Sequence, residues 1–274
     1  MRPEKEQSST LLTVSALEVC RRVGPSSDVI LDKMSFALRA GEVAGLLGES
    51  GCGKTTAALS ILNLLPASFV ISGGRVDFCG KNLLELAERK MQSVRGAQIS
   101  MIFQEPGLAL NPVMNVGTQV MEVLRAHLPW NSKKRRQATQ ALLEQLDFKE
   151  VDRIFHSYPH QLSGGQCQRV LIAQALACKP SILIADEPTA SLDMTTQAEI
   201  LALLKRLRKE YGLAMLFITH DPALLVDFAD RVLVMQQGRV IEEGPTEKIF
   251  NTSTLPFTRA IVQSAQRRAM AAGA

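Results

Sequence analysis

Hydrophobic and polar residues alternate along two segments near the start of the chain, residues 11–20 and 29–39. Alternation with a period of two is typical of strands that have one buried and one exposed face. Because the turn-forming residues 24–27 (Gly-Pro-Ser-Ser) lie between the two segments, the pattern predicts an antiparallel pair of strands.

From residue 43 onward the apolar positions gather into short, continuous runs. Residues 43–47 lead through a glycine-rich turn into a helical stretch over 55–65, which Pro66 ends. A buried strand followed by a turn and a helix is the start of a parallel α/β unit. Three later apolar runs predict further parallel strands, at residues 99–103, 182–185 and 215–218.

Two further regions complete the predicted organisation. The period is mainly helical over about residues 107–180, which predicts an inserted helical lobe and a helix that returns to the core. Residues 231–235 and 239–243 flank Gln236-Gln237-Gly238 and predict a hairpin. We expect one domain over 1–250, with a helical subdomain over about 107–178, and a tail over 251–274 with a polar loop, a short helix and a frayed end at 269–274.

Composition narrows the class of protein. A hydrophobic fraction of 46% with 21% charged residues is typical of a folded chain and excludes disorder over most of its length. The formal charge of +4 comes from Lys and Arg interspersed with acids, so we expect no nucleic-acid partner. The apolar runs are far shorter than the roughly 20 residues of a membrane helix. The polar start lacks the apolar core of a secretory signal, and the chain is expected in the cytoplasm.

The strongest chemical signal is the segment from Gly48 to Thr55, which fits G-x-x-x-x-G-K-[ST] between a predicted strand and a predicted helix. Glycines let backbone N–H groups curl around phosphate oxygens, and the start of the helix adds a favourable dipole. Lys54 is then placed to reach the β- and γ-phosphates, and the Thr55 hydroxyl to ligate Mg²⁺. The segment predicts binding of a nucleoside triphosphate through Gly48, Glu49, Ser50, Gly51, Cys52, Gly53, Lys54, Thr55 and Thr56.

A second signal is a pair of acids at the end of an apolar run. Asp186 and Glu187 follow residues 182–185, which places both carboxylates at the carboxyl edge of the predicted sheet. Asp186 suits the Mg²⁺ shell, and Glu187 is placed to polarise a water for attack on the γ-phosphate. Gln104 and His220 follow two other predicted strands, and we interpret His220 as a γ-phosphate contact.

A third signal is the signature segment, residues 162–166 (Leu-Ser-Gly-Gly-Gln), at the start of an apolar helix. Two glycines and a serine at a helix start make a second anion site, although the phosphate loop already holds the chain's own nucleotide. The simplest interpretation is a site for the ATP of another molecule. With this segment the chain resembles the ATPase subunits of ABC transporters over nearly its whole length, in motifs that follow the family's order: the phosphate loop, Gln104, the signature segment, Asp186 with Glu187, Ser191-Leu192-Asp193 and His220.

The resemblance implies a fold and a set of roles. The fold would be α/β, of the P-loop NTPase (RecA-like) type, with a parallel-sheet core, an N-terminal antiparallel β subdomain and an inserted α-helical subdomain. The cofactors would be ATP and Mg²⁺, with each ATP between the phosphate loop of one subunit and the signature segment of a second subunit. The implied residues are Lys54, Gln104, Glu187 and His220 for catalysis, Thr55, Gln104 and Asp186 for Mg²⁺, Ser163, Gly164, Gly165 and Gln166 for the second subunit's ATP, and Asp193 for communication across the dimer.

Finer resemblance is to the dipeptide, oligopeptide and nickel importers. It is carried by Leu64-Leu65-Pro66, by residues 74–78 leading to Arg95-Gly96, by residues 103–106 with 110–112, and by residues 255–260 (Leu-Pro-Phe-Thr-Arg-Ala). The implied partners are a second ABC ATPase subunit, homologous or identical, two integral-membrane permease subunits and an extracytoplasmic solute-binding protein, at the cytoplasmic face of the inner membrane. The solute stays open between peptides and nickel or metal chelates, and the absence of cysteine after Cys178 favours the metal branch.

Three residues depart from or add to the family pattern. The family stacks an aromatic residue on adenine, whereas the corresponding place here falls near Arg21, whose guanidinium would give a weaker and less selective contact. Cys52 and Cys167 lie near helix starts, where the dipole lowers a thiol pKa, although Cys167 is better interpreted as a space-filling residue. Two alternatives to transport are a non-transport ABC ATPase in DNA repair, translation or cluster assembly, and a small-molecule kinase, which leaves the signature segment unexplained.

Overall fold

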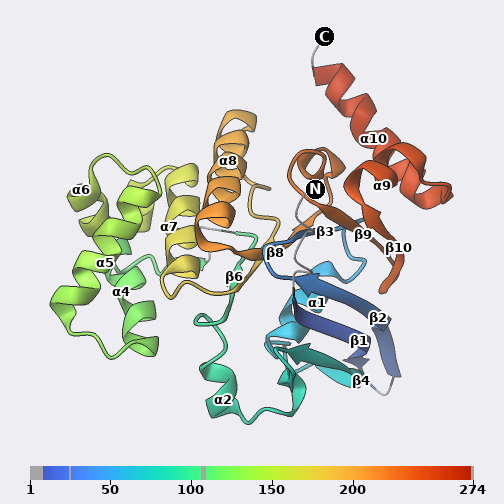
Figure 1. Ribbon diagram of the computed structural model, residues 1–274, viewed down its shortest axis with the longest axis horizontal. Coiled ribbons are helices and arrows are strands. Elements are labelled where there is room, and N and C mark those ends of the chain that lie inside the picture. The colour runs from blue at the N-terminus through green and yellow to red at the C-terminus, as the bar shows by residue number, and fades with distance from the viewer. Residues whose placement is uncertain (1–8, 25, 106–108, 273–274) are drawn as a thin grey trace, which may run out of the picture. The chain divides into compact units, whose positions relative to one another are not determined.

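The computed structural model describes the backbone of residues 9–24, 26–105 and 109–272 and divides the chain into two compact units (Figure 1). One unit contains residues 1–87 and 214–274, and the other contains residues 88–213. The expected division into a domain over 1–250 and a tail over 251–274 stays a prediction.

The first unit begins with an antiparallel sheet in the order β2-β1-β4-β5. Its central strand β1 pairs with β2 and with β4, so that Val14 has Phe36 on one side and Val76 on the other. Leu12, Val14 and their apolar neighbours on this face are buried, as the alternating pattern predicts. The strands are β1 (Thr10–Val23), β2 (Ser26–Arg39), β4 (Phe69–Phe78) and β5 (Lys81–Asn82).

A second sheet in the same unit has strands in the order β10-β9-β3-β8. Strand β3 is parallel to both β8 and β9, and β10 returns antiparallel to β9. Every residue of β3 and β8 is buried, which explains why both read as continuous apolar runs. The elements are β3 (Val43–Gly48), α1 (Lys54–Ile61), η1 (Leu83–Glu85), β8 (Ala214–Thr219), η3 (Pro222–Leu225), β9 (Arg231–Gln236), β10 (Arg239–Pro245), α9 (Thr246–Thr252) and α10 (Pro256–Ala272).

The second unit combines a parallel pair of strands with helices. Strand β6 (Ile99–Ile102) pairs in parallel with β7 (Ile182–Asp186). Helices α4, α5 and α6 pack together, and α7 contacts both α4 and β6 (Figure 1). The helices are α2 (Glu88–Gln92), α4 (Val116–His127), α5 (Ser132–Gln145), α6 (Val151–His156), η2 (Pro159–Gln161), α7 (Gly164–Leu176) and α8 (Met194–Tyr211).

These elements confirm the predicted α/β fold class, with buried parallel strands, an N-terminal antiparallel sheet and a mainly helical segment after β6. The predicted hairpin after residue 230 is β9 and β10. The helix predicted over 55–65 is shorter, because α1 ends at Ile61 and Asn63 has a positive φ of 50°. Residue 107, where the helical insertion was expected to begin, lies outside the described residues.

Strand β4 was not predicted, because Gly73-Gly74 interrupts its apolar pattern. The structure shows why glycine is needed there. Gly74 has φ +92°, and a Cβ on it would lie 2.4 Å from the carbonyl oxygen of Ala16. The pairing of β1 with β4 shifts register at this point, between Ser15 and Glu18, so the glycine accommodates a bulge rather than a turn.

The C-terminal tail contains a longer helix than predicted. Where a short helix was expected within 251–274, the structure has the 17-residue α10, and α9, which begins at Thr246, was not predicted. Residues 269–272, expected to fray, belong to α10, and residues 273–274 lie outside the described part of the chain.

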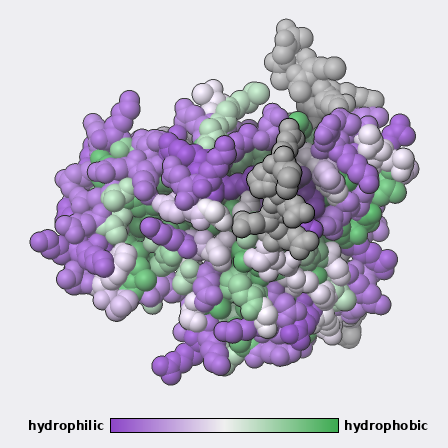
Figure 2. Space-filling model, in the orientation of Figure 1, coloured by the Kyte–Doolittle hydropathy of each residue, from purple (hydrophilic) through white to green (hydrophobic). Residues whose placement is uncertain are grey.

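Hydrophilic residues cover most of the surface visible in Figure 2. Among the residues that the structure describes, no helix combines the length and the apolarity that a membrane span requires.

Candidate functional site

The phosphate loop, residues 48–55, joins β3 to α1 through backbone conformations that favour glycine. Gly51 and Gly53 have φ of +82° and +107°, in the left-handed region. A Cβ on Gly48 would lie 2.5 Å from the carbonyl oxygen of Met235 and 2.7 Å from the sulfur of Cys52. A side chain at these positions would strain the loop or collide with its neighbours, and a glycine-rich backbone of this kind is suited to binding a phosphate group.

Lys54, the first residue of α1, is buried, with 6% of its surface exposed. Its Nζ donates hydrogen bonds to the carbonyl oxygens of Gly48 and Glu49, both at 2.9 Å. Two neutral carbonyls are weak partners for a buried ammonium group, and a phosphate oxygen would be a stronger one. The loop therefore holds a cation at the place where the sequence predicts phosphate.

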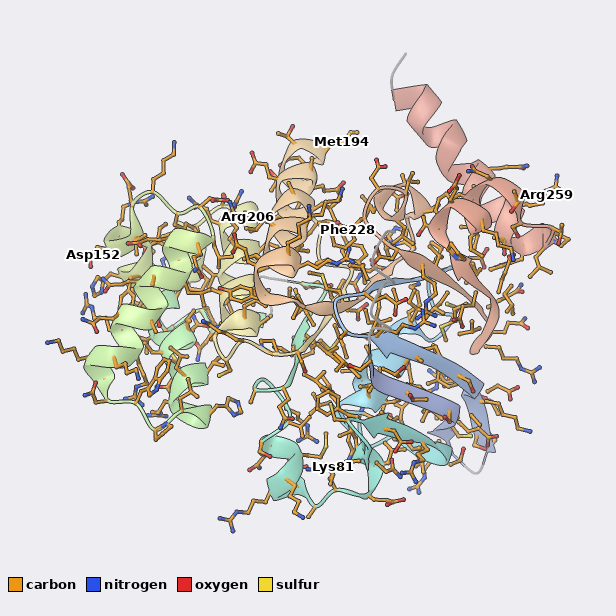
Figure 3. The ribbon with its side chains drawn as sticks, in the orientation of Figure 1. Lys81, Asp152, Met194, Arg206, Phe228 and Arg259 are labelled. Atoms are coloured by element: carbon orange, nitrogen blue, oxygen red, sulfur yellow. The ribbon has the colours of Figure 1, made fainter. Side chains whose placement is uncertain are left out.

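His220 lies at the same cavity as the start of the phosphate loop. It follows β8, whose Phe217 packs against Phe228 with ring centroids 4.7 Å apart. Phe228 is labelled in Figure 3. A cavity of about 400 Å³ is lined by Gly48, Glu49, Ser50, His220 and Pro222, together with four residues of α10. The structure thus brings His220 to the loop, as expected from the two strand ends.

The two cysteines near helix starts differ from the expectation. Burial raises the pKa of the Cys52 thiol, and this effect outweighs the nearby positive charge of Lys54, which lowers it. Burial also raises the pKa of Cys167, which is 8% exposed. The expectation of a lowered thiol pKa at Cys52 was wrong, because loss of hydration is the larger effect. Cys167 fills space, as its alternative interpretation predicts.

Arg21, expected near the adenine base, lies in β1 on an exposed surface. Its Nη2 donates to Oδ2 of Asp28 at 3.0 Å, across the β1–β2 ladder. Its guanidinium is therefore held by a carboxylate, and Arg21 is not among the residues that line the cavity at the phosphate loop.

In the second unit, polar residues gather at the ends of β6 and β7. Asp186 ends β7 and is 2% exposed, which makes it a buried carboxylate of the kind that holds Mg²⁺. Glu187 follows with a positive φ of 45°, a conformation that costs free energy in a residue other than glycine. Gln104, just after β6, donates from Nε2 to Oε2 of Glu187 at 3.2 Å. Residues 83 positions apart are thus brought together as the sequence predicts.

The signature segment forms the start of α7 through a capping box. Ser163 is the N-cap, and its hydroxyl accepts a hydrogen bond from the Gln166 N–H at 3.2 Å. The Gln166 side chain accepts one from the Ser163 N–H at 3.0 Å. Both side chains therefore shape the helix start, and backbone N–H groups of the first turn are oriented toward one end, where an anion would bind.

The turn that contains Asp193 packs against the signature segment. Asp193 is the N-cap of α8, and its carboxylate accepts hydrogen bonds from the N–H and the hydroxyl of Thr196, at 3.0 and 2.7 Å. These bonds hold the pKa of Asp193 below its ordinary value. A Cβ on Gly165 would lie 2.6 Å from Cγ2 of Thr196. Met194, which follows Asp193 and is the first residue of α8, is labelled in Figure 3. Its side chain is 77% exposed.

Sequence reasoning missed the ion pairs that hold α7 in the second unit. Arg169 donates from Nη1 to the carbonyl oxygen of Leu146 at 3.1 Å and from Nη2 to Glu199 of α8 at 2.9 Å. Arg206, labelled on α8 in Figure 3, donates to both carboxylate oxygens of Asp147 at 3.0 Å. Asp147 has φ +64°, and a Leu-Asp-Phe sequence after a helix gives little signal of this role.

The fold and the phosphate loop together indicate the class of protein. It is an α/β protein with a glycine-rich phosphate loop between a buried parallel strand and a helix. Comparison with known proteins gives the family. The family described as ABC transporter matches residues 31–190. The chain therefore belongs to the ABC transporter family.

Similar proteins span nearly the whole chain. It is 45% identical over 257 residues to the peptidoglycan transport ATP-binding protein YejF of Agrobacterium fabrum, covering 93% of this chain and 47% of that protein. It is 43% identical over 266 residues to the probable peptide ABC transporter ATP-binding protein y4tR of Sinorhizobium fredii, covering 96% and 78%. It is 42% identical over 266 residues to the glutathione import ATP-binding protein GsiA of Escherichia coli, covering 93% and 42%. The chain thus spans about half the length of YejF and GsiA.

A solved structure is similar in fold. The dimeric post-hydrolysis state of the ATP-binding cassette MJ0796, bound to ADP and Pi, superimposes with a TM-score of 0.77 at 28% sequence identity. The match covers 86% of this chain and 99% of that one.

Proposed function

We propose that this chain is the ATP-binding and ATP-hydrolysing subunit of an ABC importer for peptides or peptide-like solutes. The observation that carries the proposal is the phosphate loop, with its glycine cradle and the buried amine of Lys54. The names of the similar proteins, which concern peptide, glutathione and peptidoglycan transport, favour peptides over nickel and favour transport over a role in DNA repair or translation.

The residues of the chain divide the work between them. The amides of the phosphate loop and Lys54 would bind the β- and γ-phosphates, and Thr55, Gln104 and Asp186 would ligate Mg²⁺. When bound, Mg²⁺ would neutralise charge on the phosphate oxygens. Glu187 would accept a proton from the attacking water, held in place by the amide of Gln104.

Two copies would act together, as the dimeric state of MJ0796 suggests. The signature segment of one subunit and its Asp193 would complete the site on the other, because the capped start of α7 orients backbone N–H groups toward one end of the helix. The proposed partners are a second ATPase subunit, two permease subunits and an extracytoplasmic solute-binding protein. We place the complex with this chain at the cytoplasmic face of the inner membrane, as a peripheral subunit.

The substitution Glu187→Gln tests the proposed reaction. It keeps the hydrogen-bonding shape but removes the base, so phosphate release should fall by about 100-fold or more while ATP binding is retained. With Mg-ATP the variant should accumulate as a dimer in size-exclusion chromatography. Glu144→Gln, an exposed change on α5, is the matched control and should behave like the parent. Normal phosphate release by Glu187→Gln would refute the role of Glu187.

A further inference from the structure

Helix α10 shares a cavity with the start of the phosphate loop. Its residues Phe257, Ala260, Ile261 and Ser264 line the cavity of about 400 Å³ that also contains Gly48, Glu49, Ser50 and His220. These four positions are spaced by three and four residues, so they form one face of the helix. None of the sequence motifs assigns this helix to the nucleotide site.

The opposite side of α10 is anchored in the same unit. Thr258 is fully buried, and its hydroxyl donates to Oε2 of Glu242 in β10 at 2.6 Å. The hydroxyl of Ser253 donates to the same oxygen at 2.7 Å, and Val262 is 5% exposed. These contacts hold α10 in place against the rest of the unit. The face of α10 that lines the cavity is therefore a fixed part of the fold.

The cavity at α10 is lined by residues that also contact the Lys54 amine. Two of its lining residues, Gly48 and Glu49, supply the carbonyl oxygens that now accept the Lys54 amine. That amine is the group placed to reach the β- and γ-phosphates, and His220 lines the same cavity. The residue expected near the base, Arg21, does not.

We propose that α10 forms a wall of the nucleotide site beside the γ-phosphate, and that its exposed face therefore sets the affinity for a triphosphate more than that for a diphosphate. The inference rests on the proposed function, because it takes the phosphate loop to bind ATP. Phe257 and Ile261 make the wall partly apolar, which limits water beside the terminal phosphate and strengthens electrostatic interactions there.

A pair of opposite charges at Ala260 tests the wall. Ala260 is exposed, and both Glu and Lys are good helix formers, so Ala260→Glu and Ala260→Lys should fold like the parent. Ala260→Glu should weaken binding of AMP-PNP by about fivefold and Ala260→Lys should strengthen it, with less than about a twofold change for ADP. The measurement is calorimetric titration with Mg²⁺ at low salt, where charges act over about 10 Å or more.

Gln263 provides the matched control. It is exposed on the same helix, but it lines a different cavity with α9 residues such as Phe250 and Asn251. Gln263→Glu and Gln263→Lys should leave both affinities within about twofold.

Three results would overturn the inference: unchanged affinity in both Ala260 variants, equal shifts for AMP-PNP and ADP, or equal shifts in the Gln263 pair. If the parent protein itself fails to bind AMP-PNP, the proposed function fails. If the parent binds and Lys54→Ala abolishes binding, while the Ala260 variants do not respond, only the role of α10 fails.

Discussion

The contact between Gly165 and Thr196 predicts a specific defect and its repair. Gly165 lies in the first turn of α7, and a Cβ on it would meet Cγ2 of Thr196 at 2.6 Å. Thr196 cannot turn away at low cost, because its hydroxyl and its N–H both bond to the carboxylate of Asp193. The substitution Gly165→Ala therefore overpacks a contact between the starts of two helices.

The size of the defect follows from two opposing effects. Overpacking a fixed contact costs about 1–3 kcal/mol. Replacing glycine by alanine in a helix returns up to about 1 kcal/mol through backbone entropy. Gly165→Ala should therefore lower the free energy of unfolding by about 1–2 kcal/mol, and the melting temperature by about 2–8 °C for a chain of this size.

Thr196→Ser removes the clashing methyl group and keeps the hydroxyl that bonds to Asp193. The assay is thermal unfolding, followed by circular dichroism, of both single variants and the double variant. The melting temperature of the double variant should equal or exceed that of Thr196→Ser alone, which corresponds to a coupling of about 1–2 kcal/mol. Phosphate release by the double variant should match that of Thr196→Ser alone, because the added methyl group points toward residue 196. If the two losses simply add, the steric argument is wrong.

Two further predictions concern ionisable groups. Because burial raises the pKa of Cys52, iodoacetamide should label Cys52 more slowly at pH 7 than it labels the exposed Cys79. The labelling rate of Cys52 should rise with pH and fall when ATP is bound. Mass spectrometry of the two peptides measures both labelling rates, and equal rates would contradict the prediction. Burial alone would raise the pKa of Glu42, but the hydrogen bonds and charges of Arg231 and Arg39 together outweigh it and the pKa is lowered. A lowered pKa means that the ionised pair stabilises the protein above the ordinary carboxyl value of 4.5 and that this stability is lost as pH falls through the lower folded-state pKa. In urea unfolding, the free energy of unfolding should therefore fall less on acidification for Glu42→Gln than for the parent. Identical dependence of this free energy on pH in the two proteins would exclude the Glu42–Arg231 pair as a source of the pH-dependent stability.

The buried strands could be predicted from the sequence because their apolar residues are consecutive. In β3, β7 and β8 every residue is buried, so nothing interrupts the pattern. Strand β4 escaped prediction because its glycine pair resembles a turn. Gly74 is explained by its positive φ and by its close approach to Ala16 and Leu17 of β1, contacts that the local sequence of β4 does not reveal.

The position of polar groups at strand ends was predictable for a similar reason. Parallel strands end at a common edge, so Gln104 after β6 and Glu187 after β7 had to be near each other. Their hydrogen bond confirms this within the second unit. The direction of the pKa shift of Cys52 was not predictable, since it depends on how deeply the folded chain buries the sulfur.

The supporting residues of the signature segment show where sequence reasoning ends. The segment contributes small residues and backbone groups, so its own side chains cannot fix the position of α7 beyond the first turn. That position depends on the buried apolar residues of α7 and on Arg169, which reaches the carbonyl oxygen of Leu146 and the carboxylate of Glu199. An anion site requires glycines at fixed positions, and these form a motif that can be recognised in the sequence. An arginine or an aspartate that stabilises the position of a helix can lie at many different places in the sequence. The residues that carry the chemistry of this site can therefore be recognised from the sequence, whereas the contacts that position them can be recognised only from the structure.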